Sequence, residues 1–302
     1  RFSEADGLVS NQIRCLLESG DGTLWIGSEG GLTRYRNGKF SNFTEKNGLA
    51  ANSVRGLCED QPGGGLRIAT LRGLCTLDKN DTIRNFDIKA GTTANALKFV
   101  CKDKQGRIWT GSNEGLNCVD GTTVATYGVE AGLPDRIVNT AWEDRRGQLW
   151  VGTYHGVARM VQGKFVRRAK REGAFGDWIY TIFEDREGNL WVGGRDGLYR
   201  LAPARFTAYT TQEGLARDNA MSVCEDSAGT IWIGTWGGGL NLLTGTRDEL
   251  VPVIAGHRDI DSVIAAGVSE EQARTLATDR GIELGEHSAR LFDLHVVVKG
   301  QC

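Results

Sequence analysis

Short runs of alternating apolar and polar residues, separated by turn residues, fill most of the chain. In one representative stretch the alternation predicts strands at 137–143, 149–153 and 157–161, and a fourth strand around Phe165. Asp and Gly occur in the intervening segments. Because an Asp side chain bonds to nearby backbone amides and Gly accepts a positive φ, these segments favour tight turns. The pattern therefore predicts a four-stranded antiparallel meander of about 41 residues.

The meander recurs along the chain with a fixed period. The segment 147–152 reads Gly-Gln-Leu-Trp-Val-Gly, and close copies occur at 22–27, 106–111, 188–193 and 229–234, with a degenerate copy at 64–69. The equivalent residues, spaced 42, 42, 41, 41 and 41 residues apart, are Trp25, Arg67, Trp109, Trp150, Trp191 and Trp232. Six units therefore cover about residues 1–243, and residues 244–302 do not follow the period.

One such sheet cannot bury both of its faces, so repeats of this kind must stack on one another. A β-propeller stacks four-stranded blades radially, and units of about 40 residues with a recurrent Trp match its blades. We therefore expect an all-β propeller with a six-bladed or seven-bladed ring; an open solenoid is the alternative. The recurrent Trp side chains are expected to lie in the core, with their N–H groups bonded to the neighbouring blade.

The composition agrees with frequent turns made by glycine. Gly contributes 42 of the 302 residues, about twice its ordinary usage, whereas Pro contributes 4. The charges nearly balance, at 36 basic and 38 acidic residues, and no run of Lys and Arg offers the basic face that nucleic acid requires. No stretch of 18 apolar residues occurs, so we expect no membrane contact from this chain. Arg1, in the place of an initiator Met, indicates a piece of a longer protein.

The residue types that bind metals do not form a recognisable set. The seven cysteines include no CxxC pair and no His lies at ligand spacing, which argues against a complete disulfide framework and against a zinc site. Most of the cysteines are expected to be small buried hydrophobic residues. The turns that begin at Asp103, Asp144, Asp185 and Asp226 lack the further carboxylates that calcium requires. We expect neither a metal nor a cofactor.

Four segments carry longer motifs, at 143–153, 184–193, 211–215 and 234–240. They read Glu-Asp-Arg-Arg-Gly-Gln-Leu-Trp-Val-Gly-Thr, Glu-Asp-Arg-Glu-Gly-Asn-Leu-Trp-Val-Gly, Thr-Gln-Glu-Gly-Leu and Gly-Thr-Trp-Gly-Gly-Gly-Leu. With these motifs the chain resembles the two-component regulator propeller repeat family, over all six units. The resemblance implies the periplasmic or extracytoplasmic sensor region of a bacterial hybrid histidine kinase or a related membrane receptor. In such receptors the blades, often in two rings of seven, precede a small β-sandwich, a transmembrane helix and a cytoplasmic output domain.

Some units depart from the family pattern. In the second unit Arg67 and Ala69 replace the Trp and the following Gly. The third unit has Gly91-Thr92, and the fifth has Gly173-Ala174, where the pattern has Gly-Leu. We find no sandwich, kinase or DNA-binding segment in the chain. Transmission of a signal to an output domain is therefore implied by the resemblance alone.

The segment 244–302 differs in composition, since it has no Trp and holds three of the four histidines. Capping-box spacing at 269–272 predicts a helix near 270–280, and a strand is expected at 291–299, so this is a short α+β segment. It could supply a seventh blade, a last strand that closes the ring, or a foreign extension; alternatively, Phe2 completes the sixth unit as its fourth strand. A metal or catalytic site in this segment is disfavoured because the separations match no ligand motif among His257, Asp259, His287 and His295.

One face of the predicted ring gathers polar and aromatic residues that differ from unit to unit. In a four-stranded meander, the loop entering the first strand and the hairpin between the second and third strands emerge on the same face. Amides, carboxylates, guanidinium groups and aromatic rings at these places can recognise a polyhydroxylated or acidic small ligand. The candidate ligand-binding residues are Glu29, Arg72, Asn113, Glu114, Tyr154, His155, Trp178, Arg195, Asp196 and Trp236.

A purely structural role is the competing interpretation for this face. Asn11, Asn52 and Asn95 recur at nearly the same place in their units, so we expect them to cap turns. For the remaining polar residues the alternative is that they are simply solvated.

The leading functional hypothesis is a non-enzymatic sensory module that binds a small-molecule or saccharide ligand. Its partners would be a second copy of the chain or downstream signalling domains. A protein-interaction scaffold is one alternative. A lyase or hydrolase that uses Tyr154, His155 and Arg195 is another, although His155 has no Ser or Cys partner identifiable in the sequence. We therefore assign no catalytic residue.

Overall fold

The computed structural model describes residues 2–61, 65–86, 96–121, 123–167, 176–202, 205–226, 229–244 and 249–254. These residues form six four-stranded antiparallel sheets, three of which are preceded by a short 3-10 turn. In chain order the elements are η1 (Glu4–Asp6), β1 (Ile13–Glu18), β2 (Leu24–Ser28), β3 (Leu32–Arg36), β4 (Lys39–Phe43), η2 (Glu45–Asn47), β5 (Val54–Gln61), β6 (Gly65–Thr70), β7 (Gly73–Asp78), β8 (Ile83–Asn85), β9 (Phe99–Lys102), β10 (Ile108–Gly111), β11 (Leu116–Asp120), β12 (Thr123–Tyr127), η3 (Val129–Ala131), β13 (Val138–Glu143), β14 (Leu149–Thr153), β15 (Gly156–Val161), β16 (Lys164–Arg167), β17 (Ile179–Glu184), β18 (Leu190–Gly194), β19 (Gly197–Ala202), β20 (Arg205–Tyr209), β21 (Ala220–Glu225), β22 (Ile231–Thr235), β23 (Gly239–Thr244) and β24 (Glu249–Ile254).

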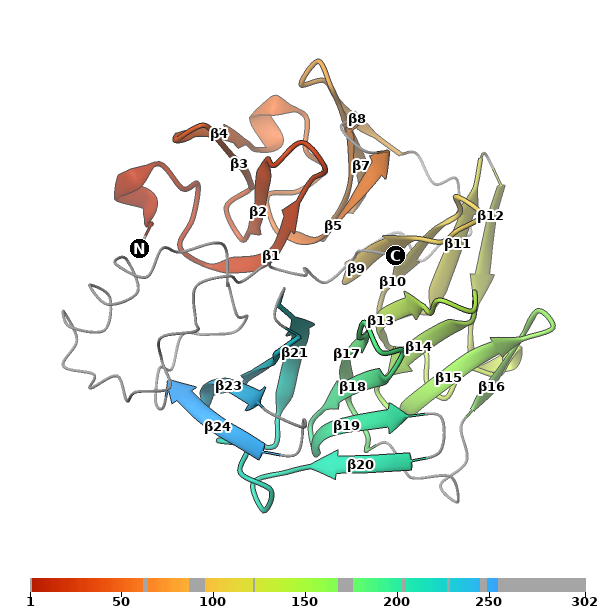
Figure 1. The fold of residues 1–302 in the computed structure, drawn as a ribbon. Helices are drawn as coiled ribbons and strands as arrows, with labels where there is room; N and C mark the ends of the chain where they lie inside the picture. The colour runs from red at the N-terminus through yellow and green to blue at the C-terminus, as the bar shows by residue number, and fades with distance from the viewer. Residues whose placement is uncertain are drawn as a thin grey trace.

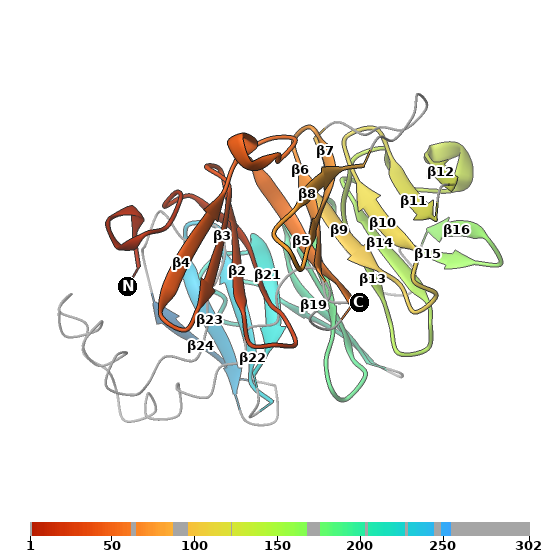
Figure 2. The same cartoon turned by 90° about the horizontal axis from the view of Figure 1, so that it is seen from above.

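Each sheet is one blade, and the six blades lie around a common centre (Figure 1). The first strands of the blades, β1, β5, β9, β13, β17 and β21, are innermost, and successive first strands contact one another from β1 through to β21. Among the described residues, β21 and β1 make no comparable contact. Figure 2 shows neighbouring blades side by side, with their strands running through the thickness of the ring. The predicted all-β propeller is therefore confirmed.

The sixth blade takes its fourth strand from beyond the end of the regular repeat. β23 pairs with β24, so residues past 243 complete this blade. The interpretation of Phe2 as that fourth strand is therefore wrong. The Phe2 ring instead lies against blade one, with its centroid 5.4 Å from that of Tyr35 and 5.3 Å from that of Phe40. The helix predicted near 270–280 and the strand predicted at 291–299 lie outside the described residues.

The glycine that follows the recurrent Trp lets neighbouring blades approach closely. A Cβ atom added at Gly152 in β14 would lie 2.6 Å from Cγ2 of Ile179 in the next blade. At Gly193 in β18 it would lie 2.7 Å from the carbonyl oxygen of Ala220. Both distances are shorter than real Cβ contacts allow. Packing between blades, more than a turn conformation, therefore requires glycine at this place in the repeat.

The recurrent Trp side chains are buried, but their N–H groups bond within their own blade. Trp191 Nε1 donates to Asp185 Oδ2 at 2.7 Å, across the turn that joins the first two strands of the blade. The equivalent bonds run from Trp109 to Asp103 (2.8 Å), from Trp150 to Asp144 (2.9 Å), from Trp232 to Asp226 (2.9 Å) and, in blade one, from Trp25 to the hydroxyl of Ser19 (3.2 Å). The expected acceptor in the neighbouring blade was wrong, because the Asp of the turn folds back over the indole.

A glutamate at the end of the first strand joins four of these turns to the next blade. In β21, Glu225 Oε2 accepts the backbone N–H of Arg186 from the preceding blade at 2.7 Å. The equivalent bonds run from Gly20 to Glu59 (3.1 Å), from Lys104 to Glu143 (2.6 Å) and from Arg145 to Glu184 (2.7 Å). Hydrogen bonds to charged acceptors are among the stronger ones. In blades three, four and five, two carboxylates thus satisfy the turn, one from its own blade and one from the next.

In blade two, cationic side chains replace both the Trp and the glutamate of the next blade. Arg67 takes the place of its Trp, and the Arg67 guanidinium lies 2.9 Å from Asp60 Oδ2. In β9 of the next blade, Lys102 occupies the place of the glutamate, and its Nζ donates to the carbonyl oxygen of Asp60. Lys102 therefore keeps the seam between blades two and three, although the buried Nε of Arg67 has no hydrogen-bond partner among the described residues.

The cysteines behave as the sequence predicts. All six of the described cysteines are buried and carry free thiols. Burial raises the pKa of the Cys118 thiol to about 11, so that it stays protonated at neutral pH.

Among the described residues, no helix is long and apolar enough to cross a membrane.

Removing the carboxylate of one turn tests its role in the fold. Asp185 is fully buried and also accepts the backbone N–H of Asn189. We expect Asp185→Ala to lower the free energy of unfolding by about 1–3 kcal/mol, because the buried Trp191 N–H would be left unsatisfied. The measurement is denaturant unfolding, with Asp120→Ala at an exposed strand end as the control. Equal stability of the two variants would contradict this role.

Candidate ligand-binding site

At the start of each innermost strand, one residue lies outside the regular pairing with the second strand of its blade. In β13 the register with β14 shifts between Val138 and Thr140, so that Asn139 is a bulge residue outside the ladder. The same shift occurs in blades one, two, five and six, and in blade three the ladder starts at Phe99, directly after the equivalent residue. Bulges redirect a side chain and are common beside binding sites. The six equivalent residues, called the bulge ring below, are Arg14, Arg55, Lys98, Asn139, Tyr180 and Met221.

Two guanidinium groups of the bulge ring share one carboxylate. Glu29 Oε1 lies 2.6 Å from Nε of Arg14 and 3.0 Å from Nη2 of Arg55. Burial alone would raise the pKa of Glu29, but hydrogen bonds from Ser53 and Arg14 and the charge of Arg55 hold it below its ordinary value. Glu29 is therefore a charged bridge between blades one and two. The three side chains together retain one net positive charge.

Lys98 extends the basic part of the bulge ring toward blade four. Its Nζ donates to Asn139 Oδ1 at 2.7 Å, and Asn139 Nδ2 donates to the carbonyl oxygen of Ile179 at 2.9 Å. The same Nζ lies 5.8 Å from the centroid of the Tyr154 ring. Side chains of the bulge ring thus link blades three, four and five, next to one of the predicted aromatic residues.

Three of the predicted residues form a stack beside Lys98. The rings of Tyr154 and Trp178 are stacked, with centroids 4.1 Å apart and planes 28° apart. The Arg195 guanidinium carbon lies 4.9 Å from the Trp178 ring, on which cation–π attraction holds it. Lys98, Tyr154, Trp178 and Arg195 are called the cation–aromatic stack below. Burial raises the pKa of the neighbouring Tyr180, so its phenol stays protonated at neutral pH.

The backbone holds the stack in place with a chain of hydrogen bonds. Tyr154 N–H donates to the carbonyl oxygen of Ile137 at 3.1 Å, Trp178 N–H donates to that of Tyr154 at 2.7 Å, and Arg195 N–H donates to that of Trp178 at 3.1 Å. Trp178 has a φ of +58°, which is unusual for a residue other than glycine. Such strain costs roughly 1–3 kcal/mol and is found most often at functional sites. The strained Trp178 is therefore the feature of this face that points most directly to a function.

Three other predicted residues make polar contacts with charged side chains on the same face. His155 Nδ1 is paired with Asp135 Oδ2, which orients the imidazole. Arg136 lies 3.0 Å from Glu114, and the pair is largely exposed. The exposed Arg72 lies 3.7 Å from Glu45. Exposed ion pairs contribute little to stability, roughly 0–1 kcal/mol, so these residues remain available to a partner.

The remaining predicted residues lie apart from the stack. Asn113 and Asp196 are exposed, and the carbonyl oxygen of Asp196 accepts the Tyr199 hydroxyl at 3.5 Å. Trp236, in the hairpin between β22 and β23, is 52% exposed, and among the described residues no ring contact joins it to Trp178. The structure therefore brings together Tyr154, Trp178 and Arg195 and leaves the other candidates distributed around the face.

The turn role expected for two asparagines is confirmed. Asn11 Oδ1 accepts the backbone N–H of Glu4 at 2.9 Å, and Asn52 Oδ1 accepts that of Glu45 at 2.8 Å. Each pins the 3-10 turn that precedes its blade. Asn95 lies outside the described residues.

None of the six residues of the bulge ring was predicted as a site residue from the sequence. The bulge interrupts the alternation of apolar and polar residues, so Arg14, Arg55 and Lys98 look like ordinary polar positions at the start of a strand. An alignment of the six units could have found them. At one position near the start of the first strand, the units have Arg, Arg, Lys, Asn, Tyr and Met in turn.

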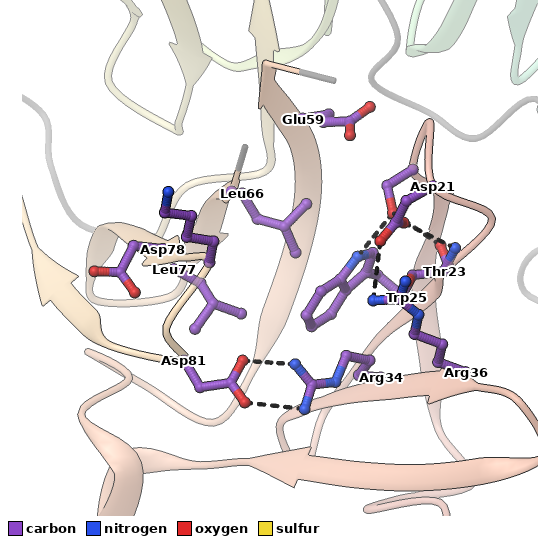
Figure 3. A pocket seen from close by; sticks show the side chains of 13 residues that line it. Asp21, Thr23, Trp25, Arg34, Arg36, Glu59, Leu66, Leu77, Asp78 and Asp81 are labelled. Carbon is purple, nitrogen blue, oxygen red and sulfur yellow. Dashed lines mark hydrogen bonds and ion pairs between the residues drawn. The ribbon is translucent and has the colours of Figure 1, made fainter. Parts of the chain in front are cut away.

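The opposite face has a cleft between blades one and two (Figure 3). Its volume is about 120 Å³, below the roughly 300–1,000 Å³ of most ligand pockets. Trp25, Leu66 and Leu77 line it, and Arg34 reaches across it to Asp81 in two hydrogen bonds of 2.6 and 2.9 Å. Because Arg34 and Asp81 are already paired with each other, this cleft is a seam between blades, and we do not assign a ligand to it.

The repeats match a known family. The protein-family model described as "Two component regulator propeller" matches residues 7–30, 173–196 and 214–237. No curated protein matches the chain.

Similar solved structures are found among sensor domains and among lyases. The extracellular domain of the putative one component system BT4673 from B. thetaiotaomicron is 20% identical, with a TM-score of 0.67, over 83% of this chain and 34% of that chain. The extracellular domain of the putative hybrid two component system BT3049 from B. thetaiotaomicron is 20% identical, with a TM-score of 0.63. This match covers 80% of this chain and 41% of that chain. A catalytically inactive virginiamycin B lyase from Staphylococcus aureus is 14% identical, with a TM-score of 0.65, over 81% and 85%. The chain thus spans about a third of the first of these structures, and the likeness shows the fold.

A double-mutant cycle tests whether the stacked rings interact. We expect Tyr154→Ala and Trp178→Ala to be non-additive in unfolding free energy by about 0.5–1.5 kcal/mol, the usual strength of an aromatic pair. A matched cycle between Trp178 and Tyr35, which lies in blade one, should be additive within about 0.5 kcal/mol. Additivity in both cycles would mean that the stack makes no contribution.

Proposed function

The chain carries repeats of the two-component regulator propeller family, and on that premise we propose that it is a ligand-binding sensor module of a bacterial two-component signalling receptor. In this proposal the module lies in the periplasmic or extracytoplasmic part of the receptor. It performs no chemistry itself and passes the bound state to a second copy of the chain or to downstream signalling domains. The similarity to extracellular domains of B. thetaiotaomicron systems supports this placement.

The strained, stacked Trp178 is the observation that carries the proposal. Stacked aromatic rings with exposed amides, carboxylates and guanidinium groups beside them are the groups that bind saccharides and other polyhydroxylated molecules. In the present structure Tyr154 covers one face of Trp178, and Arg195 lies over the ring. A saccharide would therefore reach the indole by moving the flexible Arg195 side chain, whose guanidinium would then bind the ligand.

The seams between blades supply a route by which binding could be passed on. The stack spans blades three, four and five, so a ligand on it contacts several blades at once. Blades three and four, and blades four and five, are bonded to each other through the turn and glutamate described above, at Lys104 with Glu143 and at Arg145 with Glu184. Burial raises the pKa of Glu184, and the hydrogen bond from the Arg145 N–H opposes that rise. A rigid ring of this kind would transmit a change through its contacts with neighbouring domains.

A ligand screen tests the proposal. Calorimetry with neutral and acidic oligosaccharides should find at least one that binds. Trp178→Ala and Arg195→Ala should each weaken that binding about tenfold, the effect of a loss of roughly 1.4 kcal/mol. Arg36→Ala, at an exposed hairpin on the opposite face, is the control and should bind as the wild type does. Capture of a protein partner by this face without any small-molecule binding would favour the scaffold alternative instead.

A lyase is the second candidate, and the pairing of His155 with Asp135 is the observation that favours it. The carboxylate orients the imidazole, as in many general bases, and the similar lyase is matched over most of its length. If the candidate is correct, incubation with virginiamycin B or the screened oligosaccharides should give cleaved products by mass spectrometry, and His155→Ala should abolish them. Our proposal expects no cleavage by either protein. Cleavage that survives both His155→Ala and Tyr154→Phe would exclude this pair as the catalytic residues.

A further inference from the structure

The charges at the centre of the binding face are unevenly distributed around the ring. The bulge ring is basic in three consecutive blades, at Arg14, Arg55 and Lys98, and uncharged in the next three. The basic arc ends where the cation–aromatic stack begins, because Lys98 belongs to both. Positions that are equivalent in the fold thus differ in charge, which a purely structural role for the bulge does not require.

The basic groups of this face contact a shared carboxylate, a neutral amide and aromatic rings. Arg14 and Arg55 share the carboxylate of Glu29. Lys98 donates to the amide of Asn139, which is a neutral acceptor. No carboxylate of the described residues lies within ion-pair distance of the Arg195 guanidinium, which is held by the Trp178 ring.

An anion could join or replace the contacts of Lys98 with Asn139 and of Arg195 with Trp178. An ammonium carries three N–H donors and a guanidinium carries five, so a neutral amide or an aromatic ring can give way to a stronger acceptor. Arginine binds carboxylates with two parallel hydrogen bonds, whereas lysine acts as a point charge. Lys98 contacts Tyr154 and Arg195 contacts Trp178, so the two cations flank the stacked rings. A ligand that carries more than one anionic group and a flat, partly apolar body would match both features.

We infer that the bulge ring and the cation–aromatic stack bind an acidic oligosaccharide, with Lys98 and Arg195 as its carboxylate-binding residues. This inference rests on the proposed function and names the ligand class of the same site. The sugar body lies against the aromatic pair, and the arc formed by Arg14, Arg55 and Lys98 attracts the negatively charged chain. Neutral sugars lack the groups that the basic arc would bind.

The experiment compares one oligosaccharide in charged and neutralised forms. Tri-galacturonate and its fully methyl-esterified form are titrated by calorimetry into the wild type, Lys98→Gln, Arg195→Gln and Lys164→Gln. Lys164 is an exposed residue of an outer hairpin and serves as the matched control. We expect the acid to bind at least about tenfold more tightly than the ester, which is the effect of roughly 1.4 kcal/mol. Lys98→Gln and Arg195→Gln should remove most of that difference, and Lys164→Gln none of it.

The outcomes separate this inference from the proposed function. Equal binding of acid and ester, lost in Trp178→Ala, would overturn the anionic ligand and leave the sensor proposal standing. Equal loss in Lys98→Gln and Lys164→Gln would show non-specific attraction and would also overturn it. Binding of inorganic sulfate as tightly as the tri-galacturonate would replace the sugar by a simple anion. Absence of binding by every neutral and acidic compound would contradict the inference and the proposed function together.

Discussion

The hydrogen bonds of the turn between the first two strands hold this propeller together. A sheet of four short strands cannot bury its two faces alone, so each blade depends on its neighbours. The turn carboxylate accepts the buried Trp N–H of its own blade, and the glutamate of the next blade accepts a backbone N–H of the same turn, as at Asp185, Trp191 and Glu225. Leaving such buried groups unpaired would cost about 1–3 kcal/mol each. Both acceptors occur together at the turns of blades three, four and five, and blades one and two reach the same end with Ser19 and with Arg67 and Lys102.

Because the hydrogen bonds that join the blades lie on one face of the ring, the two faces can differ. The face with the turns is occupied by bonds that every regular blade must make, and its cleft between blades one and two is closed by the ion pair of Arg34 with Asp81. The other face has loops whose backbone makes the required bonds, so its side chains can vary from blade to blade. Blade two shows how far the framework tolerates change, since Arg67 and Lys102 replace the Trp and the glutamate there and both bond to Asp60.

The fold could be predicted from the sequence, but only part of the site could. The repeat period, the turn residues and the recurrent Trp predict the blades, because each of these signals occurs in most of the units. Tyr154, Trp178 and Arg195 were recognised as residues that break the repeat, although nothing in the sequence indicates that they stack. The bulge ring was not predicted, because a bulge depends on how a strand pairs with its neighbour. The amino-acid sequence alone does not show that pairing. The acceptor of the Trp N–H was misplaced for a similar reason: the turn brings a residue six positions earlier over the indole.

The central claim is that the ring is held on one face and binds its ligand on the other. Hydrogen–deuterium exchange with and without tri-galacturonate tests it most directly, because the backbone reports both faces at once. The account predicts slower exchange on binding in the segments 96–98, 135–139, 154–155, 176–180 and 195–196, and no change in the turns at 103–107, 144–148 and 185–189. Protection that is confined to those turns, or to the cleft between blades one and two, would contradict it.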